Sequence, residues 1–99
     1  MTVTDQKVDL IPDDYAIAGV YPNPFNAMTA IRCELPERGL VRLSAYDVKG
    51  RLVDDLFAGT LDAGRHSINW SPASLSSGVY LIRMEAGGVV RMARGVMVR

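Results

Sequence analysis

The strongest constraint on the fold of this chain is an alternation of side chains with a period of two residues. In residues 29–35 the odd-numbered side chains, which include Ile31 and Leu35, fall on one side of the chain and the even-numbered ones on the other. Residues 41–46 repeat this alternation. Successive side chains of a β-strand point to opposite faces of a sheet. The period therefore predicts half-buried strands with one face toward a core.

Similar runs, separated by turn residues, continue along the chain. The expected strands are residues 15–20, 29–35, 41–46, 51–57, 66–70, 79–86 and 89–99. We expect Trp70 to be a core anchor, and Gly59 and Gly64 to bracket a turn region. No segment has a helical period, and turn signals recur roughly every 8 to 12 residues, which is typical of an antiparallel β-sandwich with about seven strands.

Two hairpins are expected from turn chemistry. Residues 47–50 have the composition of a type I turn with Gly50 in the left-handed conformation, which would fold residues 51–57 back on the preceding strand. Asp54 and Asp55 interrupt the alternation there, so we expect a bulge or an edge strand. Gly87-Gly88 is expected to be the two-residue turn before the last strand.

The segment of residues 21–26 contains Pro22 and Pro24, which fix two φ angles and lack two backbone donors. We expect an extended turn there rather than a ladder strand. Residues 1–14 are rich in aspartate and have no clear period. We expect this stretch to be a linker or loosely held arm, and residues 15–99 to form one domain.

The last strand combines apolar and basic residues. One parity contains Val90, Met92, Arg94, Val96 and Val98. Either Arg94 lies at a rim or Gly95 marks a bulge that changes the face. Arg91, Arg94 and Arg99 also make this end basic, which fits an edge strand protected by charge or a strand that a partner recognises.

Charge and composition exclude several functional classes. Lys plus Arg and Asp plus Glu each number 11, so the footprint of a nucleic-acid binder is missing. No apolar run approaches the roughly 18 to 20 residues needed to span a bilayer, and the N-terminus has no secretory signal pattern. We expect a soluble chain; if the mature protein is exported, its signal would lie upstream of Met1.

Catalytic and metal chemistry is sparse. His66, the one histidine, lies in the alternating pattern of an expected strand. We expect its side chain to be packed or at the rim of the sheet rather than to act as a catalytic base. The lone Cys33 cannot form an internal disulfide and is expected in the core. Asp13-Asp14 and Asp54-Asp55 lack the spacing of a calcium loop. We therefore predict no catalytic residue, no metal and no cofactor.

Six segments, in this order, resemble the C-terminal sorting domain of type IX secretion cargo and the similar Ig-like domain of the flagellar hook-capping protein. They are the turn Tyr21-Pro22-Asn23-Pro24-Phe25-Asn26 and residues 29–36, 41–51, 64–70, 77–80 and 94–99. The resemblance implies a seven-stranded Ig-like antiparallel β-sandwich. It also implies an address label rather than an enzyme, attached to an upstream cargo protein.

In that family the domain carries cargo from the periplasm through an outer-membrane translocon to the cell surface or medium. A cysteine-peptidase sortase often then removes it and joins the cargo to lipopolysaccharide. The glycine-x-tyrosine word of the family matches Gly78 and Tyr80, and its basic and apolar end matches residues 94–99, with arginine where many members have lysine. The residues expected to be recognised by the translocon are Gly78, Tyr80, Arg91, Arg94, Val96, Val98 and Arg99.

The expected mechanism is that residues 79–99 are presented as a charged edge or exposed tail, with main-chain pairing along the edge. Two alternatives stay open. One is a structural Ig-like module that scaffolds a catalytic or flagellar hook domain; Arg99 directly after the last strand favours the sorting domain, which must end its protein. The other is a carbohydrate-binding module with Tyr21, Phe25, Tyr46 and Trp70 as a platform. An uncovered edge strand could also pair two copies of the chain.

Overall fold

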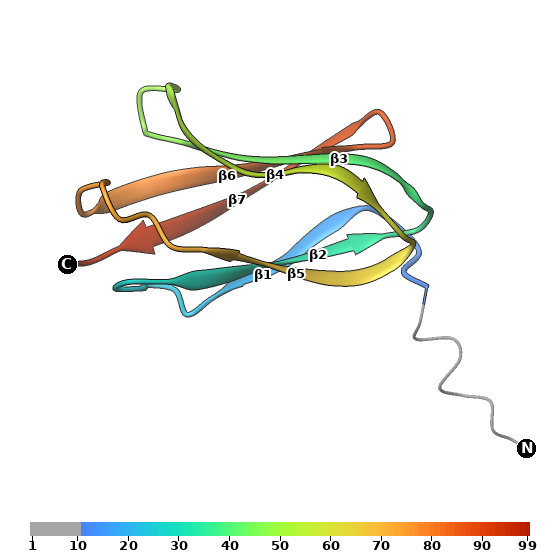
Figure 1. Ribbon diagram of the computed structural model, residues 1–99, viewed down its shortest axis with the longest axis horizontal. Helices are drawn as coiled ribbons and strands as arrows, with labels where there is room; N and C mark the ends of the chain where they lie inside the picture. The colour runs from blue at the N-terminus through green and yellow to red at the C-terminus, as the bar shows by residue number, and fades with distance from the viewer. Residues whose placement is uncertain (1–10) are drawn as a thin grey trace, which may run out of the picture.

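The computed structural model describes residues 11–99, which form two antiparallel sheets packed face to face (Figure 1). The strands are β1 (Ala16–Tyr21), β2 (Thr29–Leu35), β3 (Gly39–Tyr46), β4 (Leu52–Leu61), β5 (Gly64–Trp70), β6 (Gly78–Ala86) and β7 (Val89–Met97). One sheet has the order β1-β2-β5 and the other β4-β3-β6-β7. The predicted seven-stranded Ig-like sandwich is therefore confirmed. Within the described residues there is no helix of the length and apolarity that crossing a membrane requires.

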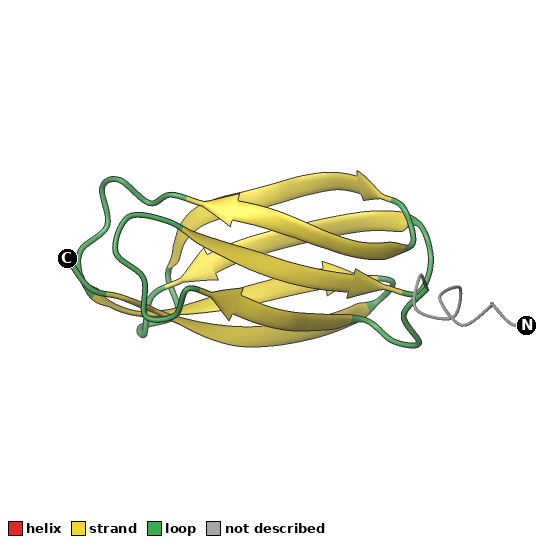
Figure 2. Cartoon of the chain, turned by 90° about the horizontal axis from the view of Figure 1, so that it is seen from below, coloured by secondary structure: helices red, strands yellow, loops and turns green. Residues whose placement is uncertain are grey.

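The strands run along the long axis of the sandwich, with loops at both ends (Figure 2). The described chain begins at the same end as the β6–β7 turn. Arg99 lies at the opposite end, together with the loops of residues 22–28 and 71–77 (Figure 1). The first half of β7 therefore lies near the beginning of the described chain, and its second half lies near the loops of residues 22–28 and 71–77.

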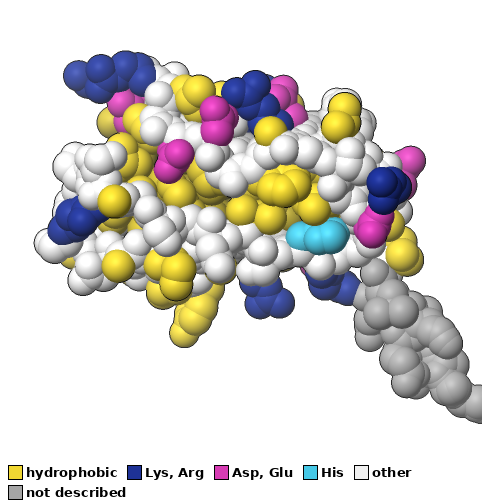
Figure 3. Space-filling model, in the orientation of Figure 1, with side chains coloured by type: hydrophobic (Ala, Val, Ile, Leu, Met, Phe, Trp, Pro, Cys, Tyr) yellow, Lys and Arg dark blue, Asp and Glu magenta, His cyan; other side chains and the backbone are white. Residues whose placement is uncertain are grey.

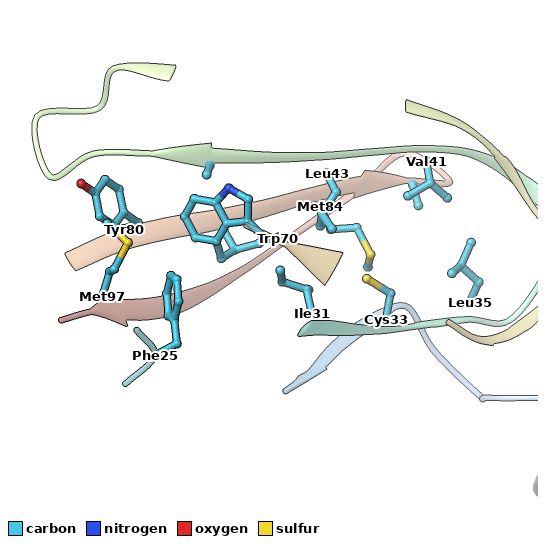
Figure 4. Packing of buried hydrophobic residues seen from close by; sticks show 13 residues of the cluster. Phe25, Ile31, Cys33, Leu35, Val41, Leu43, Trp70, Tyr80, Met84 and Met97 are labelled. Carbon is cyan, nitrogen blue, oxygen red and sulfur yellow. The ribbon is translucent and has the colours of Figure 1, made fainter. Parts of the chain in front are cut away.

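The core follows the alternation expected from the sequence. Inward side chains of β2, β3 and β6 are buried, and Cys33 faces Met84 between the sheets (Figure 4). Full burial of one such side chain stabilises the fold by about 1.5 to 3 kcal/mol. The buried hydrophobic residues are Phe25, Ile31, Cys33, Leu35, Val41, Leu43, Ala45, Trp70, Tyr80, Ile82, Met84, Ala86 and Met97. The predictions for Cys33 and Trp70 are confirmed.

The β3–β4 hairpin forms as expected. The Gly50 amide donates to the Asp47 carbonyl oxygen at 3.0 Å, and Gly50 has φ of +83°. The register of β3 and β4 shifts on both sides of the pairs that Asp54 and Asp55 make with β3, and β4 is an edge strand. The break in alternation at Asp54 and Asp55 thus coincides with an edge strand and with two shifts of register.

The end of β4 differs from the expectation. β4 continues past Phe57 to Leu61, and Gly59 lies inside it, paired with Val41. The ladder with β3 overrides the turn preference of Gly59, whose missing side chain leaves room for the Phe57 ring. The connection to β5 is therefore only residues 62–63.

For β7 the alternative of a bulge at Gly95 was wrong. The register with β6 runs without a shift from Gly78–Met97 to Ala86–Val89, so Gly95 is not a bulge. The residues of the Arg94 parity point outward, and Val90 and Met92 are exposed beside Arg94. The positions of the other parity are Val89, Arg91, Ala93, Gly95 and Met97, of which Gly95 and Met97 are buried. Alternation does not identify the inward face here, because β7 has apolar side chains on its solvent face.

The beginning of the described chain is anchored to the β6–β7 turn. The Tyr15 ring occupies the space where a side chain on Gly87 would lie, and Gly87 has φ of +57°. The Arg91 Nε atom donates to the Tyr15 carbonyl oxygen at 3.0 Å. Most of the predicted arm, residues 1–10, lies outside the described residues, so the domain boundary stays a prediction.

Candidate recognition site

Residues 21–26, which we call the clasp, lie along the outer edge of β7. The Phe25 amide donates to the Val96 carbonyl oxygen at 2.8 Å, and the Val98 amide donates to the Phe25 carbonyl oxygen at 2.8 Å. The Asn23 side chain extends the contact: its Nδ2 donates to the Arg94 carbonyl oxygen, and its Oδ1 accepts from the Val96 amide, both at 2.9 Å. These four bonds pair the Arg94 carbonyl oxygen, the Val96 amide and carbonyl oxygen, and the Val98 amide on the edge of β7 beyond Met92.

The composition of the clasp explains this geometry. Pro22 and Pro24 have no amide hydrogen, so within residues 22–25 the remaining backbone donors are the amides of Asn23 and Phe25. The Pro22 carbonyl oxygen accepts from the buried Thr29 hydroxyl at 2.7 Å. The expectation of a turn holds, with one correction: Phe25 forms an isolated parallel bridge to Met97, because its backbone replaces a neighbouring strand at that point.

Below the clasp lies a cluster of aromatic side chains. The Phe25 and Trp70 ring centroids are 5.5 Å apart, and those of Trp70 and Tyr80 are 5.9 Å apart at nearly right angles. Met97 packs at the same end of the core (Figure 4). Aromatic pairs in such tilted arrangements stabilise by about 0.5 to 1.5 kcal/mol beyond the burial itself. The cluster joins the clasp, β5, β6 and β7.

The same packing is evidence on whether these aromatic side chains could form a carbohydrate-binding surface. Phe25 and Trp70 are buried, whereas Tyr21 is 77% exposed. The Trp70 Nε1 atom donates to Asp54 Oδ2 at 2.8 Å, so its polar edge is also occupied. These side chains do not form one exposed face on which a sugar ring could stack.

Arg99 is held by the loop between β5 and β6. Its Nε donates to the Leu75 carbonyl oxygen at 2.8 Å, and its Nη2 donates to those of Pro72 and Ala73 at 2.6 and 3.2 Å. Its amide donates to the Ser77 hydroxyl at 2.9 Å. The guanidinium therefore fixes the loop that precedes β6.

The other basic residues of the hairpin have different surroundings. Arg91 bonds Tyr15 and forms an ion pair with Asp14 at 3.4 Å, so it ties β7 to the beginning of the domain. Arg94 is exposed, and its side chain makes no ion pair or hydrogen bond within residues 11–99. Sequence alone does not separate these three arginines.

The remaining predicted recognition residues are also spread over several environments. Tyr80 is buried, and its hydroxyl donates to the Ser76 carbonyl oxygen at 2.5 Å. Val96 is half-buried, whereas Gly78 and Val98 are exposed. Gly78 and Val96 lie near one another across the hairpin, since β6 pairs with β7, while Arg91 lies far from them toward the β6–β7 turn. Their recognition by a translocon stays a prediction.

Sequence reasoning missed the pairing role of Asn23 and the acceptor role of Asp54. Both residues lie in segments that were expected to be turns or irregular edges, and their partners are distant in the chain. The placement of a hydrogen-bonding amide between two prolines is the one local signal at Asn23.

Cys33 and His66 face each other across β2 and β5 and line a hollow of about 200 Å³. Burial raises the pKa of the Cys33 thiol to about 11, so the thiol is protonated at neutral pH and is a poor nucleophile. The His66 Nε2 atom lies 2.8 Å from the Asp62 carbonyl oxygen. No group of three metal-ligating side chains occurs in residues 11–99.

Comparison with known proteins gives one match. The family model described as a secretion system C-terminal sorting domain matches residues 19–98. This span includes the clasp, β6 and β7, and thus every residue of the candidate site except Arg99. A search of curated proteins found no match, and a search of solved structures found none.

Proposed function

Because the chain belongs to the secretion system C-terminal sorting domain family, we propose that it directs an attached cargo protein across the outer membrane by type IX secretion. The observation that carries the proposal is the extent of the family match, which covers nearly the whole sandwich from β1 through β7. Under this proposal the domain acts by being recognised and has no catalytic role. The cargo passes through the periplasm and is then secreted or held at the cell surface.

The clasp changes the expected mode of recognition. A partner strand could pair with β7 beyond Met92 only by displacing Asn23 and Phe25, which already use that edge. Displacement would also remove Phe25 from the aromatic core. Recognition of side chains on the folded hairpin requires neither change, and we therefore propose that the translocon recognises the folded hairpin through its side chains.

The arrangement of the ends supports this mechanism. Cargo attached before residue 11 would lie at the end of the sandwich that contains the β6–β7 turn (Figures 1 and 2). Residues 94–99 lie toward the opposite end, so the attached protein would leave them accessible. Removal by a sortase-like cysteine peptidase would then cut before Tyr15, since later residues are anchored to Arg91 or paired in β1.

The test is a fusion of this chain to the end of a periplasm-targeted reporter in a bacterium with type IX secretion. We expect the reporter in the medium or on the surface of the normal strain and only in the periplasm of a translocon-deficient strain. A variant without residues 94–99 should be retained. Retention of the full fusion despite a folded domain would contradict sorting and favour a structural Ig-like module.

A further inference from the structure

The outer face of the β6–β7 hairpin carries an unusual combination of side chains. Arg94 lies directly opposite Leu81, and Met92 and Val96 are its neighbours along β7 on the same face. Met92 is 52% exposed. On the other side of Leu81, the outer face continues to Tyr46 of β3. Arg94 is thus a cation in the middle of an apolar patch.

The other charges of this face are already compensated. Arg42 forms an ion pair with Asp55 at 3.2 Å, and Arg83 forms one with Glu85 at 3.1 Å. Arg94 has no carboxylate partner in the part of the chain that the structure describes. The outer face therefore presents one uncompensated positive charge, with apolar contact area on both sides of it.

From this arrangement, and resting on the sorting role proposed above, we infer that the outer face of β6 and β7 around Arg94 docks a partner protein that presents a carboxylate among apolar side chains. A guanidinium binds a carboxylate through two parallel hydrogen bonds, which fixes orientation as well as charge. Contact of Leu81, Met92 and Val96 with the partner would exclude water from that pair, and pairs in such a position dominate the specificity of an interface.

The charges favour a protein over an anionic membrane. Attraction to a membrane surface depends on clusters of about four to eight basic residues, each contributing a little. Here Arg94 is one cation, Asp55 and Glu85 lie on the same sheet face, and the chain has no net charge. Basic and acidic side chains are also interspersed on the face that contains β4 and β5 (Figure 3).

The chain offers a matched control in Arg32 of β2. Arg32 is also exposed, and no ion pair of Arg32 occurs within residues 11–99. Its cross-strand neighbours on the outer face of the smaller sheet are Gly19 and Ser67, so it lacks the apolar surroundings of Arg94. The same charge reversal at these two positions separates the proposed docking face from a general effect of net charge.

The experiment compares translocon-dependent export of the reporter fusion for the unchanged chain, Arg94→Glu, Arg94→Lys and Arg32→Glu. We expect Arg94→Glu to lower export about tenfold or more, Arg94→Lys to lower it partly, and Arg32→Glu to leave it close to normal. Met92→Glu, which puts an acidic group in the apolar patch, should lower export as well. The thermal unfolding midpoint of each variant verifies folding, since all these positions are exposed.

Equal export of Arg94→Glu and Arg32→Glu would overturn the inference while leaving the sorting role in place. Failure of the unchanged fusion to leave the periplasm would overturn both. A second assay measures co-sedimentation of the full chain with phosphatidylglycerol-containing vesicles. We expect no binding; binding that Arg94→Glu abolishes would show a membrane as the partner and contradict the inference.

Discussion

The four-stranded sheet ends in two edge strands, β4 and β7, that avoid unwanted pairing in different ways. β4 carries Asp54 and Asp55 and two shifts of register, which make it a poor template for another strand. β7 is regular along its whole length, and the clasp covers part of its edge. The first solution is local to the strand, whereas the second needs residues more than 70 positions earlier in the chain.

This difference ties the candidate site to the integrity of the fold. β4 takes its edge properties from its own acidic residues and from its pairing with the neighbouring strand β3. The end of β7 is paired with β6 and bonded to the clasp, and the Trp70 ring and the loop bound by Arg99 pack or bond at the same end. A partner that recognises the outer face of β7 therefore recognises a folded domain, and an unfolded one lacks the surface.

The largest effect should come from Phe25→Ala, which removes the buried ring of the clasp. Loss of a buried phenylalanine costs about 3 to 5 kcal/mol of unfolding free energy. Tyr21→Ala is the control, because Tyr21 lies in the same clasp but is mostly exposed, and its loss should cost about 0.5 kcal/mol or less. Urea unfolding measures both, and equal losses would contradict a clasp held by core packing.

Asn23→Ala removes the two side-chain bonds to β7 and leaves the Phe25 bonds in place. Two such bonds should together contribute about 1 to 3 kcal/mol to the free energy of unfolding. Asn26→Ala is the matched control, since Asn26 is exposed in the same clasp and has no hydrogen bond within the described residues. If both variants unfold at the same urea concentration, the Asn23 contact does not stabilise the edge.

On the β4 side, Asp54→Ala leaves the Trp70 indole N–H without its acceptor. Because this bond is only partly buried, we expect a loss of about 1 kcal/mol. Asp55→Ala breaks an exposed pair with Arg42 and a long bond, 3.4 Å, from the Ser44 hydroxyl. Because the ion pair is exposed and the hydroxyl bond is long, we expect a smaller loss, within about 0 to 1 kcal/mol. Thermal unfolding of the two variants checks the order; a larger loss for Asp55→Ala would contradict it.

The smallest effect concerns Asp47 in the β3–β4 turn. Hydrogen bonds from the Arg51 amide, then from the Arg51 side chain and the Lys49 amide, hold the pKa of Asp47 below its ordinary value of 3.8. A lowered folded-state pKa stabilises the protein above the unfolded-state value, and this contribution is lost as the pH falls through the lowered pKa. Asp47→Asn should therefore be less stable at neutral pH, with the difference shrinking below about pH 4. A constant difference across that range, in thermal unfolding, would contradict the assignment.

The contrast between the edges also explains which parts of the fold were predictable. The alternation in β2 and β3 identified the inward side chains because one face was polar, and the turn at Gly50 followed from local chemistry. In β7 apolar residues occur on the outer face while Gly95 lies inward, so periodicity could not identify the inward face. Gly59 was expected in a turn because the pairing of β4 with distant Val41 has no local signal.

For the candidate site, sequence identified the basic hairpin but not the different roles within it. Arg91, Arg94 and Arg99 have the same chemistry in the sequence, yet of the three only Arg94 has a side chain with no hydrogen bond or ion pair within the described residues. That difference depends on where Tyr15 and the loop before β6 lie in space. The contact of Asn23 with β7 likewise depends on the folded sandwich and could not be predicted from its neighbours.

Hydrogen exchange of individual amides in the unchanged chain tests the central claim, that the clasp completes the edge of β7. The Val96 and Val98 amides are bonded to the clasp, whereas the Met92 amide points to the same edge and has no partner within residues 11–99. We predict slow exchange at Val96 and Val98 and fast exchange at Met92. Exchange at Val96 and Val98 as fast as at Met92 would show that the clasp does not hold the strand and would contradict the account.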